Sequence, residues 1–261
     1  MVEPEASKST QAARLLLAVR RGAPRLSALP PALVPETLSG AYAIQLALLR
    51  EMHSDIAGWK ATLFGGDDGA CAPLAANAVV DAPAYTQVLG TPLLDPAPYA
   101  IEAEVAFRLG RDLPPLAPGA HYGREAVCDA VVSAHAVIEV VASRYLDPDA
   151  VSKMERVADQ LLNSLLVVGP SCPDWQSLSL GALPLEVRVQ GHPVFQGRGS
   201  HPQGDPLIPL VWLANHLSTH GRGLRAGELV TTGSCCGVQL VAPEQTASAY
   251  FVGLGSALVT F

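Results

Sequence analysis

The apolar positions of the chain follow a helical period at first and a strand period later. Over residues 9–21 and 38–52 they recur at helical spacing, and Tyr42, Leu46 and Leu49 fall on one side of the second segment. The stretch ALPPALVPE between the two is too rich in proline for a helix and predicts a connector. The chain is therefore expected to open with two helices.

Short apolar segments follow. IAGWKATL, YAIEAEVAF, HAVIEVVA and SLLVVG predict strands, and LEVRVQGHPVF predicts a hairpin that turns at residues 190–192. The stretch GGDDGACAP predicts a glycine-rich loop, without the Gly-Lys-Ser/Thr ending of a phosphate-binding loop. A short helix is expected near residues 124–132. A longer helix follows Asp205, the candidate N-cap, with Pro206 at its first position and Gly221 just past its end.

The order of these elements indicates the fold class. Helices come first and strands dominate later, without regular alternation of strand and helix. This order predicts an α+β fold with a largely antiparallel or mixed β core. We expect a boundary near residues 55–65, which divides the chain into a helical N-terminal lobe, 1–56, and a β-rich domain, 57–261.

Composition narrows the class of protein. Hydrophobic residues make up 49% of the 261 residues and charged residues 16%, which is enough for a large core. The formal net charge of −7 disfavours nucleic acid and anionic membranes as partners. No apolar run is long enough to span a membrane, and the N-terminus is acidic where a signal peptide is basic. The five cysteines, an odd number without C-x-x-C spacing, predict a reduced, cytoplasmic protein in which Cys235 and Cys236 are ordinary small residues.

Two charged residues interrupt apolar strands. Glu139 is the one formal charge in AVVSAHAVIEVVA, and Lys60 stands inside IAGWKATL. A strand that is apolar on both faces is expected to be buried on both sides. Burying a lone carboxylate costs several kcal/mol unless it is paired, protonated or bound to a metal. The alternative for each residue is a place at a strand end, where the charged group reaches water.

Glu102 and Glu104 stand two residues apart in IEAEVAF, so strand periodicity puts both on one face. That face is either solvated or, together with Glu139, an all-oxygen site for magnesium, manganese or calcium rather than zinc. Three monodentate acids leave about half of an octahedral shell open, as a catalytic metal requires. Spacing alone does not bring Glu139 to the other two acids.

Other catalytic motifs are absent from the sequence. The seven histidines lack metal-ligand spacing, and His135, near Glu139 in sequence, is the one candidate for a supporting contact to the acids. There is no G-x-S-x-G elbow and no G-x-G-x-x-G after a strand. A serine hydrolase and a dinucleotide-binding fold are therefore disfavoured.

The chain resembles the 2-keto-4-pentenoate hydratase family of the fumarylacetoacetate hydrolase-like superfamily. The resemblance runs from about residue 40 to the C-terminus through AYAIQ, GWK, IEAEVAFRLGRDLP, VIEVVASRY, VADQLLNSLLVVG, WLANHLSTHGRGLRAGELVTTGS and GLGSALVTF, in that order. It implies a mixed β-sandwich roll preceded by a helical segment, and a homo-oligomer. It also implies a small 2-keto acid as substrate.

The resemblance implies a role for each matching residue. The metal ligands, for magnesium or manganese, would be Glu102, Glu104 and Glu139. Catalysis would involve Lys60, Glu104 and Asp159, with Lys60 beside the substrate and its pKa open to lowering by desolvation and by the nearby metal. Substrate contacts would come from Lys60, Thr232, Gly233, Ser234 and Arg144, although a structural role for Arg144 is an equal alternative.

The implied reaction is the addition of water to 2-hydroxypenta-2,4-dienoate or a similar acid of aromatic catabolism. The nearest alternative is decarboxylation of an oxalocrotonate-like diacid. Hydrolysis of acylpyruvates needs a His–Glu pair on an N-terminal lid, and the sequence has no convincing one; a non-catalytic binding protein is the alternative from another class. The chain departs from the family after Lys60 and, at Gln160, Leu161 and Leu162, after Asp159. The two leucines indicate a less polar substrate pocket, with a position in the core as the alternative.

Overall fold

A computed structural model describes residues 6–66, 68–85 and 99–261. It opens with two helices, α1 (Lys8–Arg20) and α2 (Leu38–Met52), joined through the short helix η1 (Pro31–Leu33). The Ser7 hydroxyl caps α1 by accepting from the amide of Thr10, and the Thr37 hydroxyl caps α2 in the same way. The two predicted N-terminal helices are confirmed.

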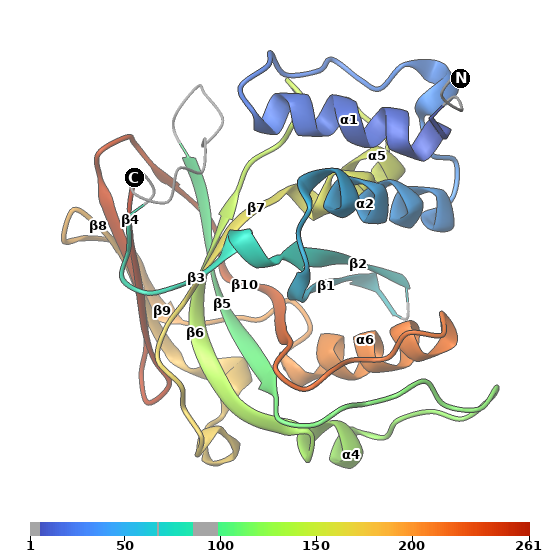
Figure 1. The fold of residues 1–261 in the computed structure, drawn as a ribbon. Helices are drawn as coiled ribbons and strands as arrows, with labels where there is room; N and C mark the ends of the chain where they lie inside the picture. Colours follow the sequence, from blue (N-terminus) through green and yellow to red (C-terminus); the bar gives the residue numbers. More distant parts are fainter. Residues whose placement is uncertain (1–5, 67, 86–98) are drawn as a thin grey trace.

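The described strands form two sheets (Figure 1). The larger has the order β2-β1-β10-β5-β6-β7-β3 and is mixed, because β1 pairs with β10, and β3 with β7, in parallel. Its strands are β1 (Ile56–Gly65), β2 (Asp68–Ala75), β3 (Val79–Asp81), β5 (Tyr99–Leu109), β6 (Val131–Val141), β7 (Asn163–Val168) and β10 (Leu229–Val241). The smaller sheet, in the order β4-β12-β11-β8-β9, contains β4 (Ala84–Tyr85), β8 (Pro184–Val189), β9 (His192–Arg198), β11 (Thr246–Phe251) and β12 (Gly255–Thr260).

The main core lies between the two sheets. Phe107 and Ile138 from the large sheet join Val187, Phe251 and Val259 from the small sheet in one buried cluster. Strand β6 is buried on its other face as well, where Val137 packs with Leu166 and Leu229. The α+β class and the mixed sheet are therefore confirmed, as is the hairpin of β8 and β9.

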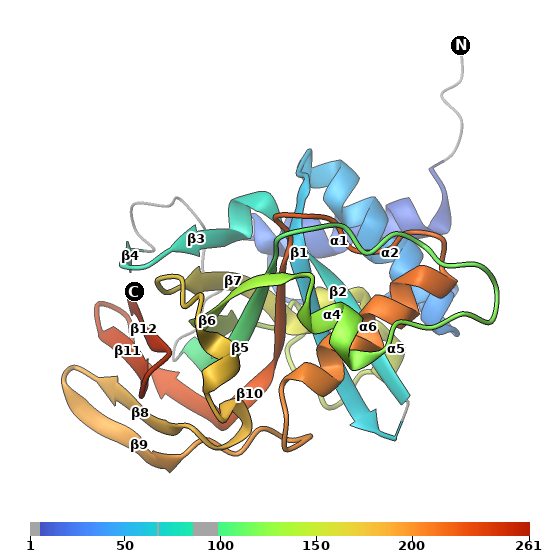
Figure 2. The same ribbon diagram turned by 90° about the horizontal axis from the view of Figure 1, so that it is seen from below.

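The helices lie at the end of the molecule opposite the small sheet (Figure 2). In Figure 1, β1 and β2 run between α2 on one side and α6 (Leu207–Thr219) on the other. Helix α5 (Lys153–Ala158) packs against α2, and α4 (Arg124–Cys128) packs against α6. Within the described part of the chain, no helix is long and apolar enough to cross a membrane. All five cysteines are free.

Several predicted boundaries need correction. The stretch GGDDGACAP is wrong as a loop, because residues 68–75 form strand β2 beside β1. Its small residues fit where larger ones do not: a Cβ on Gly69 would lie 2.7 Å from the ring of Trp212. The short helix near 124–132 ends at Cys128, and α6 begins at Leu207, whose amide donates to Asp205 Oδ1 at 2.9 Å. The division at residue 56 stays a prediction.

Candidate metal centre and adjoining pocket

Three carboxylates meet on one face of the large sheet. Strands β5 and β6 pair so that Glu102 stands directly opposite Glu139, with Glu104 two residues further along β5. One oxygen from each acid lies within 4.8 Å of the others. The alternate residues of β5 pack in the core toward the small sheet, so the acids occupy the opposite face. The strand pairing thus supplies the proximity of Glu139 that spacing alone could not.

Lys60 reaches the same cluster from β1. Its Nζ lies 2.7 Å from Glu139 Oε2 and 3.9 Å from Glu102 Oε2, and it donates to the carbonyl of Leu161 at 3.2 Å. The side chains of Lys60 and Glu139 are 8% and 0% exposed. The alternative of strand-end residues that reach water is therefore wrong for both.

The protonation of this cluster reflects its burial. Burial lowers the pKa of Lys60, but the charges of Glu139, Glu102 and Glu104 outweigh burial and leave that pKa above its ordinary value. Burial therefore acts in the predicted direction but is outweighed by the three acids, and the part of the predicted lowering that a bound cation would supply stays a prediction. Burial, and then repulsion from Glu139, raises the pKa of Glu104 to about 8. Burial likewise raises the pKa of Glu102.

Hydrogen bonds hold the acids in place. The Thr231 hydroxyl and the amide of Gly233, 2.9 Å away, donate to Glu104 Oε2. Asn163 Nδ2 donates to Glu139 Oε1 at 2.8 Å. The second oxygen of Glu104, Oε1, is buried and accepts no hydrogen bond from the part of the chain that is described.

These residues fit a divalent cation. Three carboxylates face a single ammonium group in a buried space, which leaves an excess of negative charge. Glu104 Oε1 has lone pairs without a protein donor. Oxygen ligands of this kind suit hard divalent cations rather than zinc. The acidic cluster can therefore bind such an ion.

A cavity of about 440 Å³ opens beside the acids. Its polar wall includes Lys60, Glu102, Glu104, Gly233 and Ser234. Lys153 and Arg156 also line the cavity. Its apolar wall includes Phe64, Val157, Leu161 and Leu162. The less polar pocket predicted from Leu161 and Leu162 agrees with this lining.

The comparisons with known proteins agree with this geometry. Residues 72–260 match the family described as fumarylacetoacetate (FAA) hydrolase C-terminal. The chain belongs to this family. Lys60 lies just outside the matched residues, while the three acids lie inside.

Two relatives and one solved structure illustrate the family. A 2-keto-4-pentenoate hydratase of Paraburkholderia xenovorans is 37% identical over 161 residues, 62% of this chain and 58% of the relative. A 4-oxalocrotonate decarboxylase of Pseudomonas putida is 30% identical over 161 residues, which are 62% of this chain and 59% of the relative. The structure of 4-oxalocrotonate decarboxylase from Pseudomonas putida G7, complexed with magnesium and adipate, matches 97% of each chain with a TM-score of 0.82 at 22% identity. The alignments thus span less than two thirds of these curated relatives, and the predicted resemblance is confirmed.

In this member of the family, the TTGS segment (residues 231–234) contacts the acids and the cavity through its backbone as well as through its side chains. Gly233 has φ +114°, a conformation that glycine adopts without strain, and its amide points at Glu104. Gly233 and Ser234 line the cavity. The Thr232 hydroxyl instead donates to the carbonyl of Val105 at 2.9 Å, and the Ser234 hydroxyl donates to that of Gly237.

Arg144 and Asp159 form a fully buried ion pair with each other and do not line the cavity. Arg144 also donates to the carbonyls of Asp159, at 2.7 Å, and Asn163, at 3.1 Å. Burial, partly offset by Arg144, raises the pKa of Asp159. The pair therefore secures the backbone that leads from α5 into the apolar wall, and its predicted roles in catalysis and substrate binding stay predictions.

Several residues that contact Lys60 or the acids were not predicted from the sequence. Gln160, Leu161 and Leu162 all have positive φ, between 51° and 66°, and this turn presents the Leu161 carbonyl to Lys60. No glycine marks the turn in the sequence; the departure after Asp159 was the one signal. Thr231 and Asn163, the donors to the acids, stand inside quoted motifs without any spacing rule to single them out.

Two histidines are buried and make their contacts away from the acids. His135 contacts the Ser133 hydroxyl and the carbonyl of Gly169, not the acids, so its predicted supporting contact is wrong. Its place on β6 is opposite Ala106, whereas Glu139 is opposite Glu102. His201, one of the seven histidines without ligand spacing, is buried and contacts the carbonyl of Thr232 through Nε2 at 2.8 Å.

Proposed function

We propose that the chain is a divalent-cation-dependent hydratase of a small 2-keto or 2-hydroxydienoic acid, such as 2-hydroxypenta-2,4-dienoate. The observation that carries the proposal is the convergence of Glu102, Glu104 and Glu139 with Lys60 at one wall of the cavity. The names of the hydratase relatives support the reaction type. The ion is magnesium or manganese, held by the three acids.

Each group has a task in this proposal. When bound, the cation supplies Lewis-acid polarisation of the substrate's carboxylate and adjacent oxygen. Lys60 Nζ, beside the acids, pairs with the substrate carboxylate or moves the proton between the enol oxygen and the terminal carbon as the dienol becomes the unsaturated ketone. Water then adds to the far end of the conjugated system. Gly233 and Ser234 contact substrate oxygens, and Phe64, Leu161 and Leu162 contact the hydrocarbon tail.

A decarboxylase of an oxalocrotonate-like diacid is the second candidate. Lys153 and Arg156, which line the cavity, offer two cationic groups for a distal carboxylate. Both already have partners: Lys153 Nζ lies 2.9 Å from Asp68 and 3.8 Å from the ring centre of Phe64, and Arg156 pairs with Asp149. A second carboxylate would have to displace these contacts, so we rank this candidate below the hydratase.

The proposal also covers assembly, location and pathway. The protein forms a homo-oligomer in the cytoplasm and acts in aromatic catabolism. Exposed apolar side chains on β10, Val238 at 54% and Leu240 at 62%, support a subunit contact. Light scattering coupled to gel filtration measures the state, and a monomer at micromolar concentration would contradict it.

The decisive test uses chelator-treated protein reloaded with Mg²⁺ or Mn²⁺. We expect loss of the dienol absorbance with 2-hydroxypenta-2,4-dienoate and no carbon dioxide from the diacid. Lys60→Met should bind the metal at least as tightly, because a competing charge is gone, yet lose turnover. Glu139→Gln should lose metal binding. Full turnover by a folded Lys60→Met protein would remove Lys60 from the mechanism, and turnover without any metal would overturn the proposal.

A further inference from the structure

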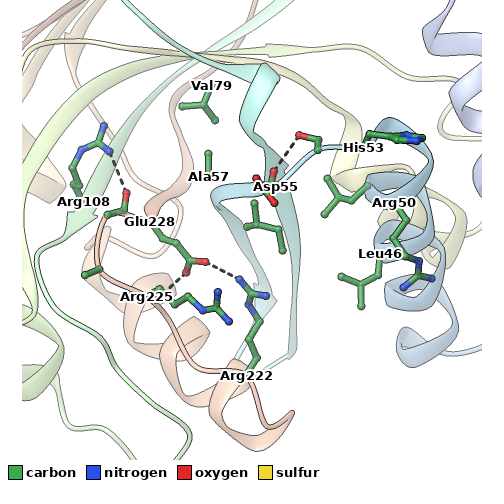
Figure 3. Close-up of a pocket in the computed structure, with 15 residues that line it drawn as sticks. Leu46, Arg50, His53, Asp55, Ala57, Val79, Arg108, Arg222, Arg225 and Glu228 are labelled. Carbon is green, nitrogen blue, oxygen red and sulfur yellow. Dashed lines mark hydrogen bonds and ion pairs between the residues drawn. The ribbon is translucent and has the colours of Figure 1, made fainter.

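A second, larger cavity of about 660 Å³ lies away from the acids, at the start of β1 and β10 and the end of α2 (Figure 3). One wall carries Arg108, Arg222, Arg225 and Glu228. In Figure 3, Ala57 and Val79 lie above Glu228, while Leu46 and Arg50 project from α2 on the far side. None of these residues belongs to the proposed metal centre.

The side chains that line this cavity carry a net positive charge, whereas the whole chain is negatively charged. Four arginines, the three above and Arg50, line it against two carboxylates, Asp55 and Glu228, which leaves two positive charges in excess. The whole chain carries −7. A local field of this sign attracts anions, and guanidinium groups bind carboxylate and phosphate oxygens in a forked geometry.

The carboxylate of Glu228 already has three hydrogen-bond donors, so the guanidinium groups of Arg50 and Arg225 are available to a bound anion. Its carboxylate accepts from Trp59 Nε1 at 3.2 Å, from Arg222 Nη2 at 2.7 Å and from the amide of Arg225 at 3.0 Å. In the described part of the chain, the guanidinium groups of Arg50 and Arg225 make no hydrogen bond or ion pair. Among the described residues, Arg108 donates only to the carbonyl of Gly227, at 3.2 Å.

The rest of the lining is apolar. Leu46, Leu49, Ile56, Ala57 and Val79 contribute to it, and Leu46 is 42% exposed. An inorganic anion would leave this surface in water, whereas an organic anion would cover it. We propose that the cavity binds a small organic anion, a carboxylate or phosphate ester on an apolar body, with its charge at Arg225 and its body against the apolar residues.

The surroundings provide an optical signal for such binding. The guanidinium of Arg222 lies 4.7 Å from the ring centre of Trp59, whose Nε1 donates to Glu228. An anion beside Arg225 redistributes the charge around Glu228 and Arg222 and therefore changes the environment of Trp59. Trp59 also precedes Lys60 on β1, so the two cavities share a strand.

The test titrates metal-loaded, full-length protein with benzoate and with phenyl phosphate by calorimetry and tryptophan fluorescence. Inorganic phosphate tests the need for the apolar body, and benzyl alcohol tests the need for charge. We expect saturable binding of at least one organic anion, at least tenfold weaker binding of the two simpler probes, and a fluorescence change that Trp59→Phe abolishes while the heat of binding remains. Whichever of benzoate and phenyl phosphate binds more tightly identifies the acidic group.

Three variants separate this cavity from the metal centre. Arg225→Ala should weaken binding about tenfold or more, since it removes a charge-assisted hydrogen bond. Arg111→Ala, which removes an exposed arginine that pairs with Asp129 elsewhere, should leave it unchanged. Lys60→Met should leave it unchanged as well. Absence of saturable binding, equal binding in Arg225→Ala, or loss of binding in Lys60→Met would overturn the proposal.

Discussion

At Glu104, burial and like-charged neighbours oppose ionisation, while hydrogen bonds favour it. The side chain is fully buried, Glu102 and Glu139 carry charge of the same sign, and its pKa rises to about 8. Thr231 and Gly233 nevertheless donate to one of its oxygens, which favours the ionised form. The structure thus holds a carboxylate in a place that suits it only when a cation is near.

We predict that Thr231→Val weakens divalent-ion binding about 10- to 100-fold, as loss of a supporting hydrogen bond does at other metal sites. Valine keeps the shape of threonine but removes the donor to Glu104, so the acid stays protonated to higher pH and competes less well for the metal. Calorimetric titration with Mg²⁺ measures the effect. Thr231→Ser, which keeps the hydroxyl, should bind within a few-fold of the parent; equal affinity in the valine variant would show that the bond does not tune the site.

At the scale of elements, the parallel pairing of β1 with β10 sets the position of Lys60. Gly58 and Leu229 face each other in this register, two residues before Lys60. A Cβ on Gly58 would lie 2.0 Å from the carbonyl oxygen of Leu229. Glycine at this position therefore permits the close backbone approach that carries Lys60 to the acids on the far side of β10.

Gly58→Ala should accordingly lower the free energy of unfolding by about 2–4 kcal/mol and weaken metal binding, because the strands must separate. Urea denaturation and Mg²⁺ titration measure the two effects. Gly123→Ala is the matched control: its Cβ would meet no atom within 4 Å, and it should change stability little. If Gly58→Ala behaved like this control, the close approach would not constrain the sheet.

The sequence predicted the local features of single strands, but not how the strands pair with one another. Alternation in β5 indicated an acidic face, and the lone charge of Glu139 in an apolar strand indicated a buried partner; both are local patterns. The register of β5 against β6, which joins them, is a tertiary property that periodicity does not encode. The strand β2 escaped prediction because its small residues have weak strand preference, and its pairing with β1 is a tertiary contact. The left-handed turn at residues 160–162 is likewise imposed by tertiary contacts.

Across the whole molecule, a buried polar network connects the N-terminal helices to the site. Arg20 of α1 donates to Gln160 Oε1 and to the carbonyl of Asn163, both at 2.7 Å. Arg144, which pairs with Asp159, donates to the same carbonyl of Asn163 and to the carbonyl of Asp159. The helical N-terminal segment thus supports the turn that faces Lys60.

We predict that Arg144→Met lowers the free energy of unfolding by about 3–5 kcal/mol, since it strands the carboxylate of Asp159 in the interior. Removing both charges, in Arg144→Met with Asp159→Leu, should cost less than the single change. Urea denaturation measures stability, and turnover under folding conditions separates support from chemistry. A KM increase in the folded single variant, with no loss of stability, would favour direct contact with substrate.

A second connection across the molecule makes its stability depend on pH. His216 of α6 stacks on Trp212, with ring centres 4.5 Å apart, and its Nε2 lies 3.0 Å from the Tyr42 hydroxyl of α2. That hydroxyl accepts from the amide of Cys71 on β2. Burial, and then the neighbouring His220, lowers the pKa of His216 to about 4. The folded protein therefore keeps His216 neutral where the unfolded chain binds a proton.

Because the folded pKa lies below the unfolded value of 6.5, the contribution is fully present above 6.5 and is lost as pH falls toward 4. The expected loss is on the order of 1–2 kcal/mol, after allowance for the partial exposure of the ring. His216→Gln keeps a hydrogen-bonding group without titrating in this range, so the difference in unfolding free energy between the parent and this variant isolates the effect from the acids at the metal centre. Urea denaturation across this pH range should show that difference shrinking or changing sign toward acid pH. A constant difference would mean that His216 is protonated in the folded state and that the contact between α2 and α6 tolerates the charge.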